Sequence, residues 1–358
     1  MLKFARKKLR KITFYLESIF QRQKLVRNSR PIDVVRAWKL GNQDLAIQII
    51  NTVSAPLKVN LSSSQYDEKI NFVVWKSINS SESEFTMNFD QDEELVKPIV
   101  ERIFHLLPLI QEFHQSTHFK LGSIQINLGD YAEADGLAFC SNRDGQILIP
   151  DDGFVRTKGY EETRDFYQKN TVPWAAKQPI VFWRGATTGI SPTGLWKDLP
   201  RIQLCAISQN SINQNLFDIG LSGIVQLSKQ DASQIESLGY LKQFIPINLS
   251  NAYKYLIDID GNSNAWSALF QKLLSGSVVL KVASPQNFRQ WYYDELIPWV
   301  NFVPIQADMS DLVEKVDWLL EHDEEARKIG ENGAKLANKL SYGRELDRAF
   351  MKINKALT

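Results

Sequence analysis

The second half of the chain repeats one pattern that restricts its fold: a short apolar run, a polar loop, and then a helical segment. Apolar runs occupy residues 179–183, 254–259, 277–282 and 301–305. Short continuous apolar runs are typical of strands buried between two layers of helices, as in parallel sheets. Successive strand–helix–strand units build such a sheet. We therefore expect an α/β fold with a Rossmann-like parallel sheet in this half.

The first half has a less regular pattern, and a length of 358 residues suggests about two domains. Apolar spacing predicts a helix over residues 93–115, bent at Pro98 and Pro108. Residues 151–178 are charged, show little periodicity, and are expected to be a connecting region. Further strands are expected at 70–75, 123–128, 136–140 and 146–149, and amphipathic helices over 310–340 with a break at His322-Asp323.

Composition excludes several classes of protein. The chain has 42 Lys and Arg against 41 Asp and Glu, and a formal charge of +1 is too small for a general nucleic-acid-binding protein. Cys140 and Cys205 are too few for a zinc cluster or a disulfide framework, and they suit a reducing cytoplasm. No apolar run reaches the roughly 18 residues of a membrane span, and a secretory signal is not expected.

Positive charge is concentrated at the N-terminus. Residues 1–30 contain ten Lys and Arg and one acid, Glu17, whereas the rest of the chain holds 32 basic and 40 acidic residues. From Ala5 to Ile19, apolar residues recur at spacings of four and three, which predicts a basic amphipathic helix. Such a helix either lies on an anionic membrane surface or packs on the body of the protein with its basic face in solvent.

The loops that follow the first two apolar runs are rich in small polar residues. They are Arg184–Gly189 and Asp260–Asn264. At the carboxyl ends of parallel strands, small residues let backbone N–H groups approach phosphate oxygens. Neither loop is a Walker A motif or a GxGxxG fingerprint, so each alone resembles an ordinary turn. Their occurrence on successive strands favours a nucleotide or sugar-nucleotide site.

The sequence Asp258-Ile259-Asp260 allows two interpretations. In an extended segment the two carboxylates would lie on one face, as chelation of a divalent metal requires. Alternatively, Asp258 pairs locally and Asp260 closes the turn before Gly261. We expect no metal site here, and we interpret His114 and His118, which lack an apparent third ligand, as structural or exposed residues.

Two longer segments point to a protein family more specifically than the short loops do. Residues 253–282 (YKYLIDIDGNSNAWSALFQKLLSGSVVLKV) and 291–316 (WYYDELIPWVNFVPIQADMSDLVEKV) resemble glycosyltransferase family 90. The upstream FWRGATTG (182–189) is similar to the Phe-Arg-Gly element of that family, and Pro200-Arg201 to its next block. The family includes animal protein O-glucosyltransferases, fungal capsule xylosyltransferases and bacterial lipopolysaccharide glycosyltransferases. The resemblance covers about residues 179–340.

The resemblance implies a GT-B fold, in which two Rossmann-like domains face each other across a cleft. It also implies a metal-independent, inverting transfer from a nucleotide sugar, probably UDP-glucose or a related UDP-sugar, with no cofactor. The Asp-Tyr pair of the family matches Asp130-Tyr131, so Asp130 would be the catalytic base. The residues that would bind the donor are Arg184, Gly185, Thr187, Thr188, Arg201, Asp260, Gly261, Asn262, Ser263, Asn264 and Trp266.

The chain departs from the animal members at two places. It has Ala186 where they have serine, and Ser267 and Ala268 where they have an arginine after the glycine loop. The cysteine framework of the secreted animal enzymes is also absent. We therefore expect a bacterial enzyme that acts on a lipopolysaccharide or another cell-envelope glycan or glycolipid acceptor. The alternative is a non-catalytic protein that binds a nucleotide or a glycan at a membrane surface.

The expected organisation has four parts. A basic helix (1–30) would precede an acceptor-side domain with the catalytic base (31–175) and a nucleotide-sugar-binding domain (176–340). A last helix (341–358) would pack back on the first domain. We expect a cytoplasmic protein, peripheral at the inner membrane face if the basic helix binds lipid.

Overall fold

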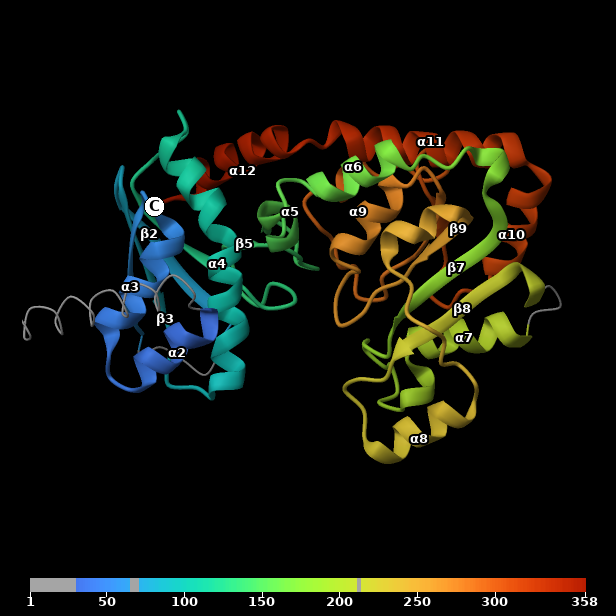
Figure 1. Cartoon of the computed structure of the whole chain (residues 1–358), viewed down its shortest axis with the longest axis horizontal. Helices are drawn as coiled ribbons and strands as arrows, with labels where there is room; N and C mark the ends of the chain where they lie inside the picture. Colours follow the sequence, from blue (N-terminus) through green and yellow to red (C-terminus); the bar gives the residue numbers. More distant parts are fainter. Residues whose placement is uncertain (1–29, 65–70, 211–213) are drawn as a thin grey trace, which may run out of the picture. The chain divides into compact units, whose positions relative to one another are not determined.

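The computed structural model describes residues 30–64, 71–210 and 214–358, and these form two compact units (Figure 1). Unit 1 contains the described residues up to Gly129 together with Phe350–Thr358, and unit 2 contains Asp130–Ala349. The predicted basic helix lies outside the described residues, apart from Arg30. Within the described part of the chain, no helix is both long and apolar enough to cross a membrane.

Unit 1 combines a mixed sheet with three helices. Its strands lie in the order β1-β3-β2-β4, where β2 is antiparallel to both neighbours and β1 is parallel to β3. The antiparallel β2–β3 pair follows from the short turn that joins them. The elements are α2 (Pro31–Lys39), α3 (Gln43–Ser54), β1 (Lys58–Ser63), β2 (Phe72–Asn79), β3 (Glu82–Met87), α4 (Glu93–Gln115) and β4 (Gly122–Asn127).

The core of unit 1 explains why a Ser-rich stretch forms a strand. In β3, Ser83, Phe85 and Met87 are buried at alternate positions, which places them on one face of the sheet. The Ser83 hydroxyl accepts a hydrogen bond from Trp75 Nε1 at 3.0 Å and bonds to His114 Nε2 at 2.8 Å. Burial lowers the pKa of His114. His114 is therefore a core residue, as the structural interpretation predicted.

The end of the chain packs on unit 1. Helix α12 (Tyr342–Ala356) places the Phe350 ring 5.7 Å from that of Phe113. The backbone N–H of Ser123 donates to the carbonyl of Thr358 at 3.0 Å, so the last residue continues the edge of β4. Residues 350–358 thus complete the core of the first unit.

Unit 2 contains the parallel sheet that the apolar runs predicted. Five strands lie in the order β11-β10-β9-β7-β8, and every neighbouring pair is parallel. This confirms the α/β class. The strands are β7 (Gln178–Ala186), β8 (Phe217–Gly223), β9 (Tyr253–Asp258), β10 (Val278–Val282) and β11 (Val303–Ile305). Two short strands that do not belong to this sheet, β5 (Leu137–Ala138) and β6 (Ile147–Leu148), pair with each other in parallel.

Helices cover this sheet, as Figure 1 shows. The predicted break near His322 is confirmed, because α10 ends at Glu321 and α11 begins at Asp323. The stretch 151–178, expected to be a connecting region with little periodicity, forms two helices, α5 and α6. The helices are α5 (Asp152–Arg156), α6 (Glu161–Lys169), α7 (Pro200–Asn210), α8 (Lys229–Ser237), α9 (Ser267–Leu274), α10 (Leu312–Glu321) and α11 (Asp323–Lys339).

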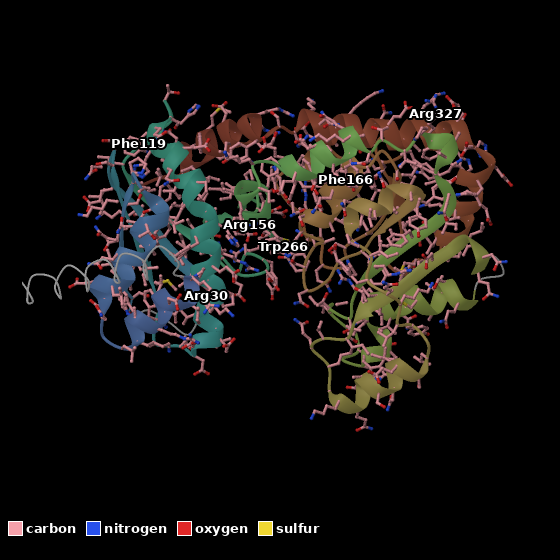
Figure 2. The ribbon with its side chains drawn as sticks, viewed as in Figure 1. Arg30, Phe119, Arg156, Phe166, Trp266 and Arg327 are labelled. Atoms are coloured by element: carbon pink, nitrogen blue, oxygen red, sulfur yellow. The ribbon has the colours of Figure 1, made fainter. Side chains whose placement is uncertain are left out.

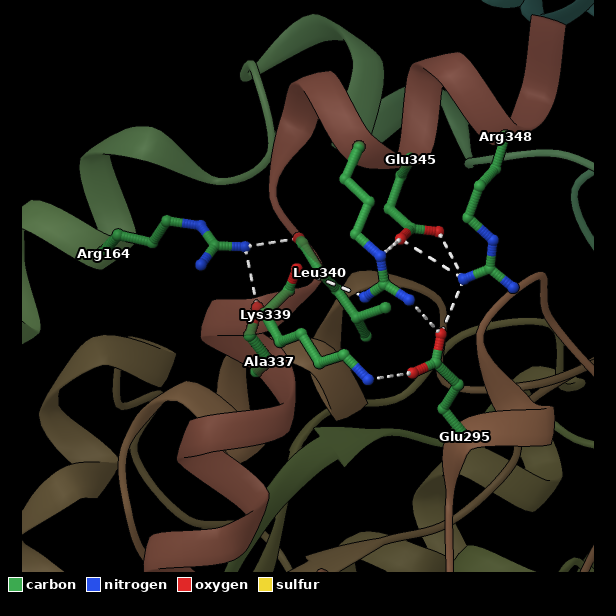
Figure 3. A network of polar contacts seen from close by, with 8 residues as sticks. Arg164, Glu295, Ala337, Lys339, Leu340, Glu345 and Arg348 are labelled. Atoms are coloured by element: carbon green, nitrogen blue, oxygen red, sulfur yellow. Dashed lines mark hydrogen bonds and ion pairs between the residues drawn. The ribbon is translucent and has the colours of Figure 1, made fainter.

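An ionic network fixes the junction between α11 and α12 (Figure 3). Glu295 accepts from Arg348 at 2.6 Å, from Arg344 at 2.8 Å and from Lys339 at 3.4 Å. Arg164, on α6, donates to the carbonyls of Ala337 at 3.0 Å and Leu340 at 2.9 Å. These contacts hold the end of α11 against two other segments of unit 2, although partly exposed pairs contribute only about 0–1 kcal/mol each.

A buried carboxyl in unit 2 predicts a pH dependence of stability. Asp151 accepts hydrogen bonds from Phe154 N at 2.9 Å, Tyr160 Oη at 3.2 Å and Gln290 Nε2 at 3.3 Å. Burial nevertheless raises its pKa to about 7. Between about pH 4 and this value the folded state binds more protons than the unfolded state, so the free energy of unfolding falls as pH rises.

Asp151→Asn should remove this fall in the free energy of unfolding with rising pH. Urea unfolding of both proteins at about pH 4.5 and 7.5 should show that the wild type loses on the order of 2–4 kcal/mol more than the variant. Asp135→Asn, whose side chain is 96% exposed, is the matched control and should behave as wild type. Equal pH slopes for wild type and Asp151→Asn would contradict this interpretation.

Candidate functional site

The polar loops after β7 and β9 lie together because their strands are neighbours in the parallel sheet. Val181 pairs with Tyr255, so the two carboxyl ends meet at the same edge. At Gly261 an added Cβ would lie 2.8 Å from Thr188 Oγ1 and 3.1 Å from Arg201 Nη2. The first contact is shorter than real side chains make and the second is tight, so glycine at 261 lets the loops approach each other without displacing Thr188 or Arg201.

Arg201, in the first turn of α7, joins these two loops. Its Nε donates to the carbonyl of Asp260 at 2.9 Å, and its Nη2 donates to that of Ile259 at 3.2 Å. Its Nη1 donates to the carbonyl of Ala186 at 3.1 Å and to Thr188 Oγ1 at 2.7 Å. Four of the five guanidinium N–H groups are therefore used within the protein.

The charge of Arg201 remains in place at this loop junction. Burial lowers the pKa of the guanidinium, and the nearby carboxylates of Asp258 and Asp260 oppose that shift. An arginine ionises far above neutral pH, so the group stays a cation. Arg201 therefore fixes the loops and supplies a half-buried positive charge beside them.

A cavity of about 300 Å³ opens beside this junction. Its walls come from the end of β7, from β9, and from the first turns of α9 with Ser267 and Ala268. Phe244, 65% exposed, and Ile245 form part of its wall. A mostly apolar pocket with a few polar groups, next to a half-buried cation, is a typical small-ligand site.

Arg184 lies on this cavity but has its own partners. Its Nη2 donates to Asp218 Oδ1 at 2.7 Å, and its Nη1 donates to the carbonyl of Asp218 at 2.7 Å. The guanidinium also lies 4.8 Å from the centre of the Phe182 ring. Arg184 thus links β7 to β8 and forms a cationic wall of the cavity.

The two aspartates after β9 have different surroundings. Asp258 is completely buried and pairs with Lys272 at 2.9 Å and with Lys281 at 3.3 Å. Burial opposes its ionisation, but the two ammonium groups outweigh that effect and lower its pKa. Both Asp258 oxygens are engaged by lysines, which favours the local-pairing interpretation of Asp258-Ile259-Asp260. No group of three or more His, Cys, Asp or Glu in the described residues is arranged to hold a metal ion.

The rest of the Asp260–Asn264 loop carries buried polar atoms without partners. In the described structure no hydrogen-bond partner is found for either carboxylate oxygen of Asp260, for Ser263 Oγ or for Asn264 Nδ2. Burial raises the pKa of Asp260 to about 6, with Lys281 lowering it only in part. Buried polar atoms of this kind usually bind water or a ligand.

Asp130 lies beside this loop within unit 2. Asn262 Nδ2 donates to Asp130 Oδ2 at 3.3 Å. The loop then reaches Trp266, labelled in Figure 2, whose φ of +46° is unusual for a residue with a side chain. Trp266 N donates to Asn264 Oδ1 at 2.8 Å, which holds this turn before α9. The amide of Asn262 can therefore orient the carboxylate that the sequence singled out.

The structure brings together most residues that the sequence singled out. Arg184, Gly185 and Arg201 line the cavity, Thr188 and Gly261 meet at Arg201, and Asn262 reaches Asp130. Thr187 is different: its hydroxyl donates to the carbonyl of Val225 and accepts from its N–H, both at 2.8 Å. Sequence reasoning missed Phe244, which lies between α8 and β9 and belongs to none of the motifs.

Comparison with known families places the chain in one of them. The sequence profile of glycosyl transferase family 90 matches residues 156–344, more than half of the chain. The chain therefore belongs to glycosyl transferase family 90, which confirms the resemblance seen in the motifs.

Curated relatives match about half of this chain in sequence. Protein O-glucosyltransferase 3 of Rattus norvegicus is 33% identical over 176 residues, 48% of this chain and 30% of that protein. Protein O-glucosyltransferase 2 of Danio rerio is 33% identical over 172 residues, 48% of this chain and 31% of that protein. The match thus spans about a third of the length of these curated relatives.

Solved structures give a more distant likeness. HepE of Anabaena in complex with UDP-glucose has a TM-score of 0.35 and 14% sequence identity. The likeness covers 54% of this chain and 52% of that one.

Proposed function

We propose that this protein is an inverting glycosyltransferase that moves a sugar from a nucleotide sugar to a lipopolysaccharide or another cell-envelope glycan. The observation that carries the proposal is the loop Asp260–Asn264, which Arg201 anchors at one end and which contacts Asp130 through Asn262. This arrangement brings a half-buried cation and a carboxylate into contact with the same short segment. A transfer reaction needs both: positive charge for the leaving diphosphate and a base for the acceptor.

In the proposed reaction the Asp130 carboxylate takes the proton of an acceptor hydroxyl. The hydroxyl oxygen forms a bond to the anomeric carbon of the donor sugar from the face opposite the leaving group. The bond from that carbon to the nucleotide diphosphate breaks, so the configuration inverts. Asn262 donates to Oδ2 of Asp130 and so helps to orient the carboxylate. Charge developing on the diphosphate would be stabilised by Arg201 and by loop N–H groups.

The donor is proposed to be UDP-glucose or a related UDP-sugar, with no metal required. The proposal draws on family membership and on the O-glucosyltransferase names of the relatives. It also draws on Asp258, whose two oxygens are paired with lysines. EDTA should therefore leave transfer nearly unchanged.

A panel of nucleotide sugars, followed by NMR for release of the nucleotide and for the anomeric configuration of the product, tests this proposal. UDP-sugar turnover that persists in EDTA is the expected result. Activity lost in EDTA and restored by Mn²⁺ or Mg²⁺ would contradict the arginine-based route. Binding without turnover of any donor would favour a non-catalytic nucleotide- or glycan-binding protein.

We also propose that residues 1–30 bring a cytoplasmic enzyme to the inner membrane face. The support is the ten basic residues of this segment, since each basic residue near an anionic surface contributes about 1 kcal/mol. A truncated chain that begins at residue 31 should no longer sediment with anionic liposomes at low salt, whereas the full chain should. Equal sedimentation of the two proteins would make the segment structural instead.

A further inference from the structure

The cavity beside Arg201 has walls of a single sign of charge. Among the described residues that line it, three are cations, Arg184, Arg201 and Lys272, and none is acidic. A recess lined by one sign of charge concentrates ligands of the opposite sign. The motifs account for the two arginines, whereas Lys272, on α9, is not among the donor-binding residues that they predict. The chemistry of this third cation is therefore open.

Arg184 has little hydrogen-bonding capacity left for a ligand. Its Nε donates to the carbonyl of Gln243 at 3.2 Å, and its Nη1 donates to that of Trp183 at 2.9 Å. Its Nη1 and Nη2 also donate to the carbonyl and the carboxylate of Asp218, both at 2.7 Å. Four of its five N–H groups are thus engaged, as they are in Arg201. The two arginines together leave few donors for the many oxygens of an anionic ligand.

Lys272 differs from both arginines. One N–H of its ammonium donates to Asp258 Oδ1 at 2.9 Å, and within the described residues no second acceptor is found for the other two. The side chain is only 12% exposed. Burying unpaired donors of a charged group is costly unless a ligand or water satisfies them. Lys272 therefore offers the cavity two N–H groups and a positive charge.

The fold holds this ammonium at the cavity. Leu256 and Asp258 alternate along β9 and so lie on one face of the sheet, and Leu256 lines the cavity. On α9, Ala268 and Lys272 are four residues apart, which places them on one face of the helix, and both line the cavity. Asp258 thus anchors the lysine from below while the helix directs it to the ligand space.

The charges around Asp258 do not balance. Asp258 also pairs with Lys281, on β10, at 3.3 Å, and Arg201 lies near both Asp258 and Asp260. Three cations therefore share two carboxylates. Burial lowers the pKa of Lys272, Asp258 opposes that shift, and the positive charges of Arg201 and Lys281 add to it. An anion beside Lys272 would offset this excess of positive charge.

We propose that Lys272 binds phosphate oxygens of a nucleoside diphosphate in this cavity. The two N–H groups that Asp258 does not use would donate to those oxygens. The apolar part of the wall, which includes Phe244 and Ile245, suits a nucleoside better than free phosphate. The assignment rests on the proposed function, because the diphosphate is the leaving group of the donor. Lys272 would then share with Arg201 the charge that develops on it.

The test compares UDP with uridine, which lacks the phosphates, on the full chain. Lys272→Met should weaken UDP binding, measured by calorimetry, by about 10–100-fold, as loss of a hydrogen bond to a charged group does. Uridine binding, measured by NMR titration, should stay nearly unchanged. Lys272→Gln is a second variant that keeps a neutral donor for Asp258, and it should show the same selective loss.

Lys281→Met is the matched control. It removes the other lysine from Asp258, its side chain is 11% exposed, and it does not line the cavity. UDP binding should therefore stay within a few-fold of wild type. Equal losses in Lys272→Met and Lys281→Met, or a parallel loss of uridine binding, would give Lys272 a structural role through Asp258 and overturn the proposal.

The remaining outcomes separate this proposal from the proposed function. UDP binding that depends on Lys272 in a protein that turns over no nucleotide sugar would support the site and refute only the transfer. Turnover and UDP binding at wild-type levels in both Lys272 variants would refute the site alone. A wild-type chain that does not bind UDP would overturn both. Circular dichroism melts monitor folding, and failure of both Lys272 variants to fold would also make the residue structural.

Discussion

Replacing Asp130 with asparagine should lower the rate of sugar transfer by about 10²–10⁴-fold, the usual contribution of a general base. Asparagine has nearly the same shape, and its oxygen can still accept the hydrogen bond from Asn262 that the carboxylate accepts at 3.3 Å. It cannot take a proton from the acceptor. Donor binding, measured by calorimetry with UDP-glucose, should therefore stay within a few-fold of wild type.

Asp135→Asn is the matched control for this experiment. Asp135 lies five residues further on, and its side chain is 96% exposed and pairs with Arg143 at the surface. This variant should transfer sugar at the wild-type rate. Full activity in Asp130→Asn would remove Asp130 from the mechanism, whereas a loss of donor binding in the same variant would assign it a structural role.

Arg201→Ala should abolish both donor binding and transfer. Removing the guanidinium leaves the carbonyls of Ala186, Ile259 and Asp260 without their donor, and each buried acceptor that loses its partner costs about 1–3 kcal/mol. The two loops would then separate at the mouth of the cavity. Arg201→Lys should rescue little, because one ammonium cannot reach acceptors arranged around a planar fork.

An exposed arginine of unit 2 offers the control. Arg327 on α11 pairs with Glu324 and Glu331 at the surface, so Arg327→Ala should leave binding and transfer unchanged. Calorimetry with UDP-glucose and a circular dichroism melt would separate loss of the site from loss of the fold. A stable Arg201→Ala protein that binds UDP-glucose as wild type does would contradict the role given to Arg201.

The parallel sheet could be predicted because most of its strands are visible in the sequence as short apolar runs. The runs at β7, β9 and β10 are apolar on both faces, as helices on both sides of the sheet require. Strand β8 was missed because its sequence, FDIGLSG, is interrupted by Asp218, Gly220 and Gly223. Gly220 is explained only by tertiary structure: an added Cβ there would lie 2.6 Å from the Lys242 side chain.

The candidate site was predictable in position but not in detail. Motif matching located Arg201 and Gly261, but it did not show that the guanidinium bonds mainly to backbone carbonyls. Those contacts depend on how the fold brings Arg201 to Asp260, which lies 59 residues further along the chain. The pairing of Asp258 with Lys272 and Lys281 is likewise a product of folding, since nothing local in the sequence distinguishes it from chelation.

The most direct test of the central claim is hydrogen–deuterium exchange with and without UDP-glucose. The account predicts slower exchange in residues 184–188, 244–250 and 259–267, which surround the cavity and its anchored loop. Exchange in α10 should not change, because the described residues that line the donor cavity include none from this helix. If UDP-glucose protects none of these three segments, or protects a different face of unit 2 instead, the assignment of the donor site is contradicted.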